Sequence, residues 1–222
     1  MSRILISNSS ESPVPGAAGQ TLRSGIRKQA LNKGTNLTLE GLAGDHIVDR
    51  RFHGGPDQAL LVMGEADYRF WELGEGAAPA LGPLARGLFG ENLTLHGWSS
   101  FDACVGDQLI GPDWHIEITA PRSPCNTFNK VMRSRIGGWA DRFRAAERPG
   151  AYVRVLSPGF IEAGQTVSLQ PWQGERIRIA DMLHLKWKTL ARDAELEQLL
   201  RLPISERERK GLTARLNGVA GL

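Results

Sequence analysis

The residues best suited to chemistry in this chain of 222 residues lie around one cysteine, in the stretch PRSPCNTFN at positions 121–129. Prolines on both sides of Arg122-Ser123 restrict the backbone to extended conformations, and a helix is expected to begin directly after Cys125. A helix N-terminus and a nearby guanidinium both stabilise a thiolate and therefore lower the pKa of a cysteine. A thiolate binds soft transition metals and attacks electrophilic substrates. A single cysteine can equally be a small buried hydrophobe, so this stretch alone leaves its role open.

A second candidate stretch is HGGPDQA, at positions 53–59. Gly54 and Gly55 can adopt left-handed dihedral angles and approach a ligand closely, and their N–H groups can form an anion-binding nest. His53 and Asp57 flank these glycines with a potential metal ligand or proton donor. The same residues are also typical of a tight turn before the apolar run that follows, with Asp57 bound to the local backbone.

The third candidate stretch is FGENLTL, at positions 89–95. Gly90 precedes Glu91 and Asn92, whose side chains can hydrogen-bond to the edge of a heterocycle such as a pterin or a purine. A turn before a strand explains these residue types equally well, because Gly and Asn are common in turns.

Other catalytic motifs are missing from the sequence. It contains no CxxC pair of the zinc-finger type, no GxSxG, no Walker loop and no GxGxxG. A cysteine–histidine hydrolase stays open, because Cys125 could meet His53, His46 or His96 in the fold. Cys104 lacks a neighbouring arginine and flanking prolines, and it is assigned to the core.

Composition places the chain among ordinary globular proteins, with 41% hydrophobic and 23% charged residues. The net charge of +3 is too small to indicate binding to a nucleic-acid polymer. No signal peptide is recognisable, and no apolar run approaches the ~18 residues that span a bilayer. Two cysteines are few for a disulfide scaffold. We therefore expect a cytoplasmic protein with free thiols and no membrane association.

The elements that must position these residues are mostly short strands in the first two-thirds of the chain. A helix is expected over 65–74, and the Pro/Gly/Ser-rich stretch 10–20 reads as a loop. Strands of this number and spacing predict a barrel or a sandwich. The expected strands lie at 3–7, 37–45, 59–63, 92–97, 107–111, 114–120, 151–156 and 166–170.

Two later segments have helical patterns. Residues 126–147 carry apolar side chains at roughly helical spacing, with an interruption at Gly137-Gly138. The cations of the overlapping basic stretch 130–148 form either a solvated helix face or the rim of a site for an anionic ligand. From about residue 176 the chain reads as helices, and SERE at 205–208 has the form of a capping box.

Five stretches occur in an order that is specific as a set: GLAGDHIVDRRFHGGPDQAL, FGENLTLHG, VGDQLIG, IEITAPRSPCNTFNK and GAYVRVLSPGFIEAGQTVSL. Together they resemble the MOSC domain, the family related to the C-terminal part of molybdenum cofactor sulfurases. The arrangement is most similar to the YiiM type, a MOSC domain followed by a short three-helix module. The resemblance implies a mainly β fold of the α+β class, with a closed or partly open β-barrel and peripheral helices at 1–175 and a helical module at 176–222.

The resemblance also implies a cleft that binds the molybdenum cofactor, a pterin dithiolene that carries a phosphate. The cysteine of its PRxPC motif falls on Cys125, which would be the catalytic residue and the thiolate ligand of molybdenum. We expect the phosphate near Arg122 and the basic stretch 130–148. The residues that would bind the cofactor are His53, Gly54, Gly55, Asp57, Gly90, Glu91, Asn92, Arg122, Ser123 and Asn129.

Proteins of this type reduce N-hydroxylated compounds, such as hydroxylaminopurine-type bases, to the amines, which implies an oxidoreductase with a small-molecule substrate. The sequence has no flavin, haem or iron–sulfur motif, so electrons would come from a separate reductase protein. The oligomeric state, monomer or homodimer, stays open. Cations of the C-terminal helices form either a docking surface for that partner or a solvated face: Lys186, Lys188, Arg207, Arg209 and Lys210.

Two other functions remain open for the same cysteine. MOSC domains are also proposed as sulfur carriers, in which Cys125 would hold a persulfide and no metal would be bound stably. A third possibility is a module that binds or stores the cofactor without turnover.

Overall fold

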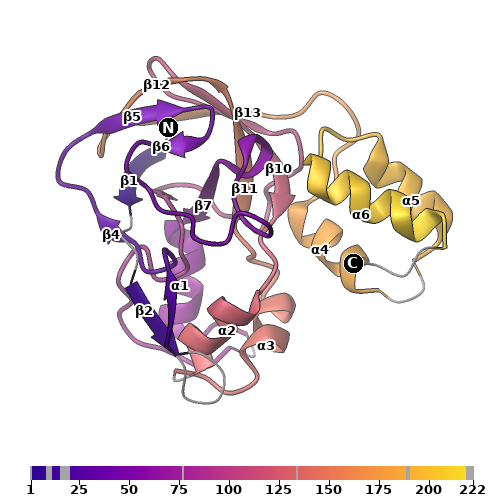
Figure 1. Cartoon of the computed structure of the whole chain (residues 1–222), viewed down its shortest axis with the longest axis horizontal. Helices are drawn as coiled ribbons and strands as arrows, with labels where there is room; N and C mark the ends of the chain where they lie inside the picture. The colour runs from indigo at the N-terminus through magenta and orange to yellow at the C-terminus, as the bar shows by residue number, and fades with distance from the viewer. Residues whose placement is uncertain are drawn as a thin grey trace.

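The computed structural model describes residues 2–8, 12–15, 21–76, 78–133, 135–188 and 191–218. The strands of its main sheet are β1 (Ser2–Asn8), β4 (Gln29–Ala30), β7 (Leu60–Gly64), β8 (Leu93–Leu95), β9 (Gln108–Ile110), β10 (His115–Pro121), β11 (Ala151–Ser157) and β13 (Thr166–Gln170). The strand order is β13-β9-β10-β11-β7-β8-β1-β4, and β1 also pairs with β13. The sheet therefore curls into a barrel, to which β4 adds a short edge (Figure 1).

Smaller elements surround this barrel. A three-stranded sheet contains β5 (Thr35–Thr38), β6 (Gly41–Leu42) and β12 (Gly159–Ile161), and a hairpin contains β2 (Ser12–Pro15) and β3 (Thr21–Ser24). The helices are α1 (Glu65–Leu73), α2 (Asn126–Arg133), α3 (Trp139–Ala145), α4 (Ile179–Trp187), α5 (Asp193–Leu200) and α6 (Glu206–Leu216), with a short 3-10 turn η2 (Pro56–Gln58). In Figure 1, α4, α5 and α6 lie together beside β10, and α2 and α3 lie below the barrel.

The expected fold class is confirmed: the chain is mainly strands, curled into a barrel, with several peripheral helices. The helix expected over 65–74 is α1, and the helical segment 126–147 divides into α2 and α3 at Gly137-Gly138. One expectation was wrong. The stretch 10–20 is not all loop, because Ser12–Pro15 pairs with Thr21–Ser24 as a hairpin. The neighbouring residues 9–11 and 16–20 lie outside the described residues.

β10 is the strand that leads to Cys125, and it is buried on both faces beyond its first residue. One reason is its central place in the sheet, between β9 and β11. The other is that α4 packs against it. Burial on both faces holds the end of the strand in one place, so the segment that follows starts from a fixed point.

Two apolar clusters hold the fold together. The first continues from the barrel into the C-terminal helices, where Leu196, Leu199 and Leu212 join barrel residues such as Val153. The second lies under α1, α2 and α3 and is mainly aromatic: Tyr68, Trp71, Phe89, Phe128, Trp139 and Phe143. Because the first cluster is continuous, α4 to α6 are part of the barrel's packing. A domain boundary between residues 175 and 176 stays a prediction.

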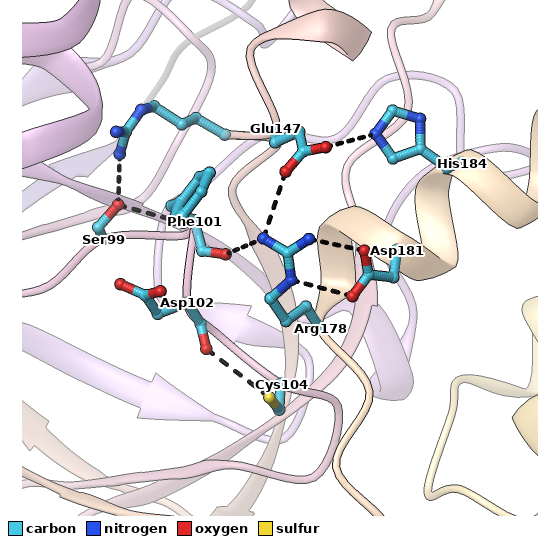
Figure 2. Close-up of polar contacts among 9 residues, drawn as sticks. Ser99, Phe101, Asp102, Cys104, Glu147, Arg178, Asp181 and His184 are labelled. Atoms are coloured by element: carbon cyan, nitrogen blue, oxygen red, sulfur yellow. Dashed lines mark hydrogen bonds and ion pairs between the residues drawn. The ribbon is translucent and has the colours of Figure 1, made fainter.

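A polar network ties α4 to the barrel (Figure 2). Arg178 donates to the carboxylate of Asp181 at 2.7 and 2.9 Å and to Glu147 at 3.2 Å. Glu147 also contacts Nε2 of His184 at 3.2 Å. It has a φ of 54°, and among the described residues it is the one non-glycine with a positive φ. The network therefore holds a strained turn before β11 against the first turns of α4.

Two further predictions concerned the burial of Cys104 and a capping box at the start of α6. Cys104 is buried at 5% exposure, as expected for a core residue. Half of the capping box is confirmed, because Oγ of Ser205 accepts the N–H of Glu208 at 3.3 Å. The carboxylate of Glu208 instead accepts from Lys186 at 2.6 Å. None of the described helices is both long and apolar enough to cross a membrane.

Shared packing between the barrel and the C-terminal helices predicts a single unfolding transition. Leu199 is fully buried, so Leu199→Ala should lower the free energy of unfolding by about 2–5 kcal/mol. Chemical denaturation followed by circular dichroism and by tryptophan fluorescence measures this change. The exposed Leu73→Ala is the control and should change the free energy by no more than about 0.5 kcal/mol. Two separate transitions, with only one affected by Leu199→Ala, would contradict shared packing.

Candidate functional site

A cavity of about 550 Å³ contains Cys125 in its wall. Its wall comes from β3 and the segment after it, the loop before η2 together with η2 and the start of β7, the turn before β8, the link from β10 to α2, and the start of β11. Residues from all three candidate stretches meet there, although they are far apart in sequence. Those that line the cavity are His53, Gly54, Gln58 and Ala59 from the first of these stretches along the chain, Gly90 and Asn92 from the next, and Arg122, Cys125 and Thr127 from the last.

Cys125 lies in the short link between β10 and α2. Its thiol is free and half-buried, and Sγ accepts the N–H of Phe128 at 3.4 Å, at the N-terminus of the helix. Burial of the Cys125 thiol opposes its ionisation and raises its pKa. This effect is outweighed by a hydrogen bond with His53, the charge of Arg122 and the Phe128 N–H, all of which favour the thiolate. Together these interactions lower the pKa of Cys125 to about 7. A large fraction of this cysteine is therefore thiolate at neutral pH.

Arg122 is buried beside this thiol, at 3% exposure. Its guanidinium carbon lies 3.3 Å from the ring centroid of Phe128. Burial lowers the pKa of Arg122, while Tyr152, Cys125 and Glu91 favour its charged form. Within the described part of the chain, its Nη1 has no hydrogen-bond partner. Buried donors are normally satisfied, so an open guanidinium donor in a cavity wall indicates an anionic or acceptor group of a ligand.

Two glycines allow the backbone to approach the cavity. Gly54 has a φ of 72° and Gly90 a φ of 80°, conformations that other residues rarely adopt. A side chain at Gly54 would lie 2.6 Å from Ile47, and one at Gly90 would lie 3.0 Å from Ile26. Both positions therefore favour glycine because of their backbone conformation.

Asn92 organises a polar part of the wall that the sequence did not reveal. Its Nδ2 donates to Asp45 at 2.8 Å, and its Oδ1 accepts the N–H of Leu61 at 3.1 Å. Asp45 in turn accepts from Nζ of Lys28 at 2.6 Å. Burial lowers the pKa of Lys28, and Asp45 opposes that effect. Asn92 thus positions a buried ion pair in the cavity wall.

Glu91 does not line the cavity. It is fully buried and accepts hydrogen bonds from the Tyr68 hydroxyl at 2.5 Å, the Gly87 N–H at 2.6 Å and the Thr94 hydroxyl at 3.0 Å. Burial raises the pKa of Glu91 despite these donors. Its visible contacts are structural, and a role in cofactor binding stays a prediction.

The other expected binding residues lie around the cavity without lining it. Asp57 pairs with Arg154 at 3.3 Å and accepts the N–H of Glu206 at 3.0 Å. Gly55, next to η2, has a φ of 90° and open space around it. Asp57 and Gly55 stay predictions as cofactor ligands.

Ser123 and Asn129 are likewise outside the cavity wall. The hydroxyl of Ser123 accepts from Lys186 at 3.2 Å, on the side of α4. Asn129 lies one helical turn after Cys125, where its N–H donates to the Cys125 carbonyl oxygen at 2.9 Å, and its Oδ1 is buried without a partner among the described residues. Their roles as cofactor ligands stay predictions.

The positive charges at the cavity do not come from the basic stretch 130–148, none of whose described residues lines it. They come from Arg23, Arg50, Arg51 and Lys28 together with Arg122. Sequence reasoning missed the first four, as well as Asp45 and Tyr152. Asp45, Arg50 and Arg51 stand in the same stretch as His53, in GLAGDHIVDRRFHGG, so their place before that motif was a usable signal.

The histidines also differ in their placement. His53 hydrogen-bonds to Cys125, and His46 lines the same cavity. His96 is exposed and does not line it. A nucleophile–base pair of Cys125 and His53 is therefore geometrically available, whereas His96 is excluded as its base.

Comparison with known proteins identifies one family. A family model described as "MOSC domain" matches residues 49–168. YflK of Bacillus subtilis (strain 168) is 30% identical over 151 residues, 68% of this chain and 65% of that protein. YiiM of Escherichia coli (strain K12) is 30% identical over 148 residues, 66% of this chain and 63% of that protein. A protein named "Reductase" from Gibberella moniliformis (strain M3125 / FGSC 7600) is 31% identical over 158 residues, 69% of this chain but 27% of that protein. The chain thus spans less than two thirds of the length of each of these relatives.

Solved structures show the same fold. The crystal structure of YiiM from Geobacillus stearothermophilus superposes with a TM-score of 0.75 at 22% identity, covering 97% of this chain and all of that one. The crystal structure of YiiM from Escherichia coli gives a TM-score of 0.74 at 21% identity and covers 100% of this chain and 96% of that one. At this level of identity the likeness concerns the fold.

The environment of Cys125 predicts a reactive thiol at neutral pH. In the Cys104→Ser background, the rate of alkylation by iodoacetamide should rise with pH to a plateau, with a midpoint at about 7. His53→Asn removes a hydrogen bond to the thiolate, so it should raise the midpoint by about one pH unit and slow the reaction at pH 7 about fivefold. A midpoint that is the same with and without His53 would contradict this account of the thiol.

Proposed function

This chain belongs to the MOSC domain family, and from that premise we propose that it is a molybdenum cofactor-dependent reductase of N-hydroxylated compounds. MOSC domains are generally associated with binding of this cofactor. The observation that carries the proposal is a free cysteine of lowered pKa beside a buried arginine with an open donor, in the wall of one cavity. The products would be the corresponding amines.

The residues of the cavity fit such a cofactor chemically. A thiolate at Cys125 is a soft ligand, suited to a metal that is already bound by sulfur. The open donor of Arg122 can bind an anionic oxygen, and the cations Arg23, Arg50 and Arg51 lie on the same wall for a phosphate. The cavity is large enough for a small heterocycle. The phosphate is therefore proposed on the side of residues 23–51 and Arg122.

When bound, the cofactor would supply two-electron removal of oxygen from nitrogen, RNHOH + 2e⁻ + 2H⁺ → RNH₂ + H₂O. The chain's own groups would bind and orient the reactants. Cys125 is held rigidly by the β10–α2 link and by the Phe128 N–H, so little ordering is needed on binding. His53, which hydrogen-bonds to the thiol from the cavity wall, is a group that can hold a proton next to the reacting atoms.

The relative named "Reductase" supports an oxidoreductase, and the name belongs to that protein. The sequence shows no motif for a flavin, haem or iron–sulfur cluster, so we propose a separate reductase protein as electron donor. The C-terminal cations expected to dock it are largely engaged within the chain. Lys186 pairs with Glu208, Lys188 with Glu195 and Lys210 with Glu206, and Arg207 and Arg209 donate to backbone carbonyls. The docking surface for the donor stays a prediction.

The proposal predicts that both metal content and turnover depend on one cysteine. Protein from a host that makes the cofactor should contain molybdenum and pterin, and with reduced methyl viologen as donor it should reduce 6-hydroxylaminopurine to adenine. Cys125→Ser should lower the rate at least about 100-fold, because the thiolate ligand is lost. Cys104→Ser is the matched control, since this cysteine is buried away from the cavity, and it should keep wild-type activity.

Full activity of Cys125→Ser would refute the proposal that thiolate ligation is essential. Cofactor bound without any turnover would favour a binding module. A sulfur carrier predicts a mass increase of about 32 Da on Cys125 after treatment with a cysteine desulfurase, in protein without molybdenum. Intact and peptide mass spectrometry distinguish this outcome from the reductase.

A further inference from the structure

The segment from Phe52 to Gln58 contributes to the cavity wall and also contacts helix α6. His53, Gly54 and Gln58 line the cavity. Asp57 and Gln58, a few residues later, reach α6, which starts about 150 residues further along the chain. The segment that carries His53 therefore lies between the cavity and the C-terminal helices.

Three hydrogen bonds join this segment to α6. The carboxylate of Asp57 accepts the N–H of Glu206 at 3.0 Å, at the N-terminus of the helix. Arg207 donates through Nη1 to the carbonyl oxygen of Phe52 at 2.6 Å and also to the side-chain oxygen of Gln58. One guanidinium thus bridges both ends of the segment and closes it into a loop.

The bond to Phe52 matters because His53 is the next residue. His53 comes from the loop before η2, whereas Cys125 comes from the β10–α2 link, so no shared element fixes the distance between them. Within the segment, the N–H groups of Phe52 and His53 bond to the Asp49 carbonyl oxygen at 3.3 and 3.1 Å. These are local contacts within one turn. The barrel holds the other end of the segment, where Thr119 Oγ1 donates to the Asp57 carbonyl oxygen at 2.6 Å. The hydrogen bond from Arg207 to Phe52 joins the histidine end of the segment to α6.

We propose that Arg207 is a positioning residue: by bridging Phe52 and Gln58 from α6, it holds His53 against Cys125 in the cavity. The C-terminal helices then complete the site from behind without lining it. An effect of this arrangement on turnover rests on the proposed function. The position of His53 relative to Cys125 does not depend on that function.

Helix α6 offers a matched control in Arg209. Arg209 is two residues further along, and its guanidinium also donates to backbone carbonyls, of Leu200 at 2.7 Å and Leu202 at 3.0 Å. Those carbonyls belong to the last residue of α5 and to the α5–α6 connection, and neither residue is in the Phe52–Gln58 segment. Arg209→Ala therefore removes a comparable arginine and comparable bonds from the same helix, and leaves the Phe52–Gln58 segment anchored.

The test uses the full chain without cofactor and measures amide hydrogen exchange by NMR. Arg207→Ala should speed exchange at the amides of Phe52, His53 and Gln58 about tenfold, because local opening becomes easier. The amide of Ala59, which bonds to the Val153 carbonyl in the barrel, should be unchanged. Arg207→Lys keeps the positive charge but has fewer hydrogen-bond donors. Its amide exchange rates at Phe52, His53 and Gln58 should therefore lie between those of wild type and Arg207→Ala. Arg209→Ala should leave the exchange of residues 52–58 as in wild type.

A second signal reports the histidine itself. In protein with ¹³C-labelled histidine, the ring resonance of His53, assigned with His53→Asn, should move in Arg207→Ala toward its position in Cys125→Ala. Unchanged exchange and an unchanged His53 resonance in Arg207→Ala would overturn the proposal. Equal effects of Arg209→Ala on residues 52–58 would also overturn it, since the cause would then be general loosening of the helices. Neither measurement needs cofactor or turnover, so failure of the proposed reductase activity would leave this result standing.

Discussion

Burial of one positive charge is the constraint on which the candidate site depends. Removing a guanidinium from water costs several kcal/mol unless its surroundings compensate. The surroundings of Arg122 compensate part of this cost. Its charge lies over the Phe128 ring, a contact that stabilises a desolvated cation by up to about 2 kcal/mol. It also lies next to Tyr152 and the Cys125 thiol. One donor remains open. The protein therefore maintains a charged group that is incompletely satisfied until a ligand binds, and this same charge helps to ionise the cysteine.

The rest of the fold supplies the rigidity that such a site needs. Arg122 and Cys125 both lie in the link from β10 to α2, and the Arg122 N–H donates to the Gly150 carbonyl at 3.2 Å. The aromatic cluster below α2 fixes the ring on which the guanidinium rests. The position of Arg122 relative to Cys125 is thus determined by the short link between β10 and α2, two well-packed elements. His53 reaches the thiol from another part of the chain. Its position relative to Cys125 therefore depends on contacts outside that link, among them the hydrogen bond from Arg207 of α6 to Phe52.

Sequence patterns identified much of this in advance, for reasons that differ between residues. The strands and helices carry clear periodicity, and Arg122, Cys125, His53, Gly54, Gly90 and Asn92 stand in short motifs whose residue types are suited to ligands. All six meet at the cavity. Local patterns failed where a role depends on tertiary pairing. Glu91 faces Tyr68, and Asp57 meets the N–H of Glu206, about 150 positions away, so neither contact has a local signature. Lys28 was missed for the same reason, because its partner Asp45 is 17 positions away.

The central claim is that Cys125 is a sulfur ligand of molybdenum in this cavity. X-ray absorption at the molybdenum K-edge tests it most directly, on the full chain purified with cofactor from a host that makes it. The wild type and Cys104→Ser should each show one sulfur ligand more than Cys125→Ser. The same number of sulfur ligands in wild type and Cys125→Ser would contradict the account, because the cysteine would then lie beside the cofactor without binding its metal.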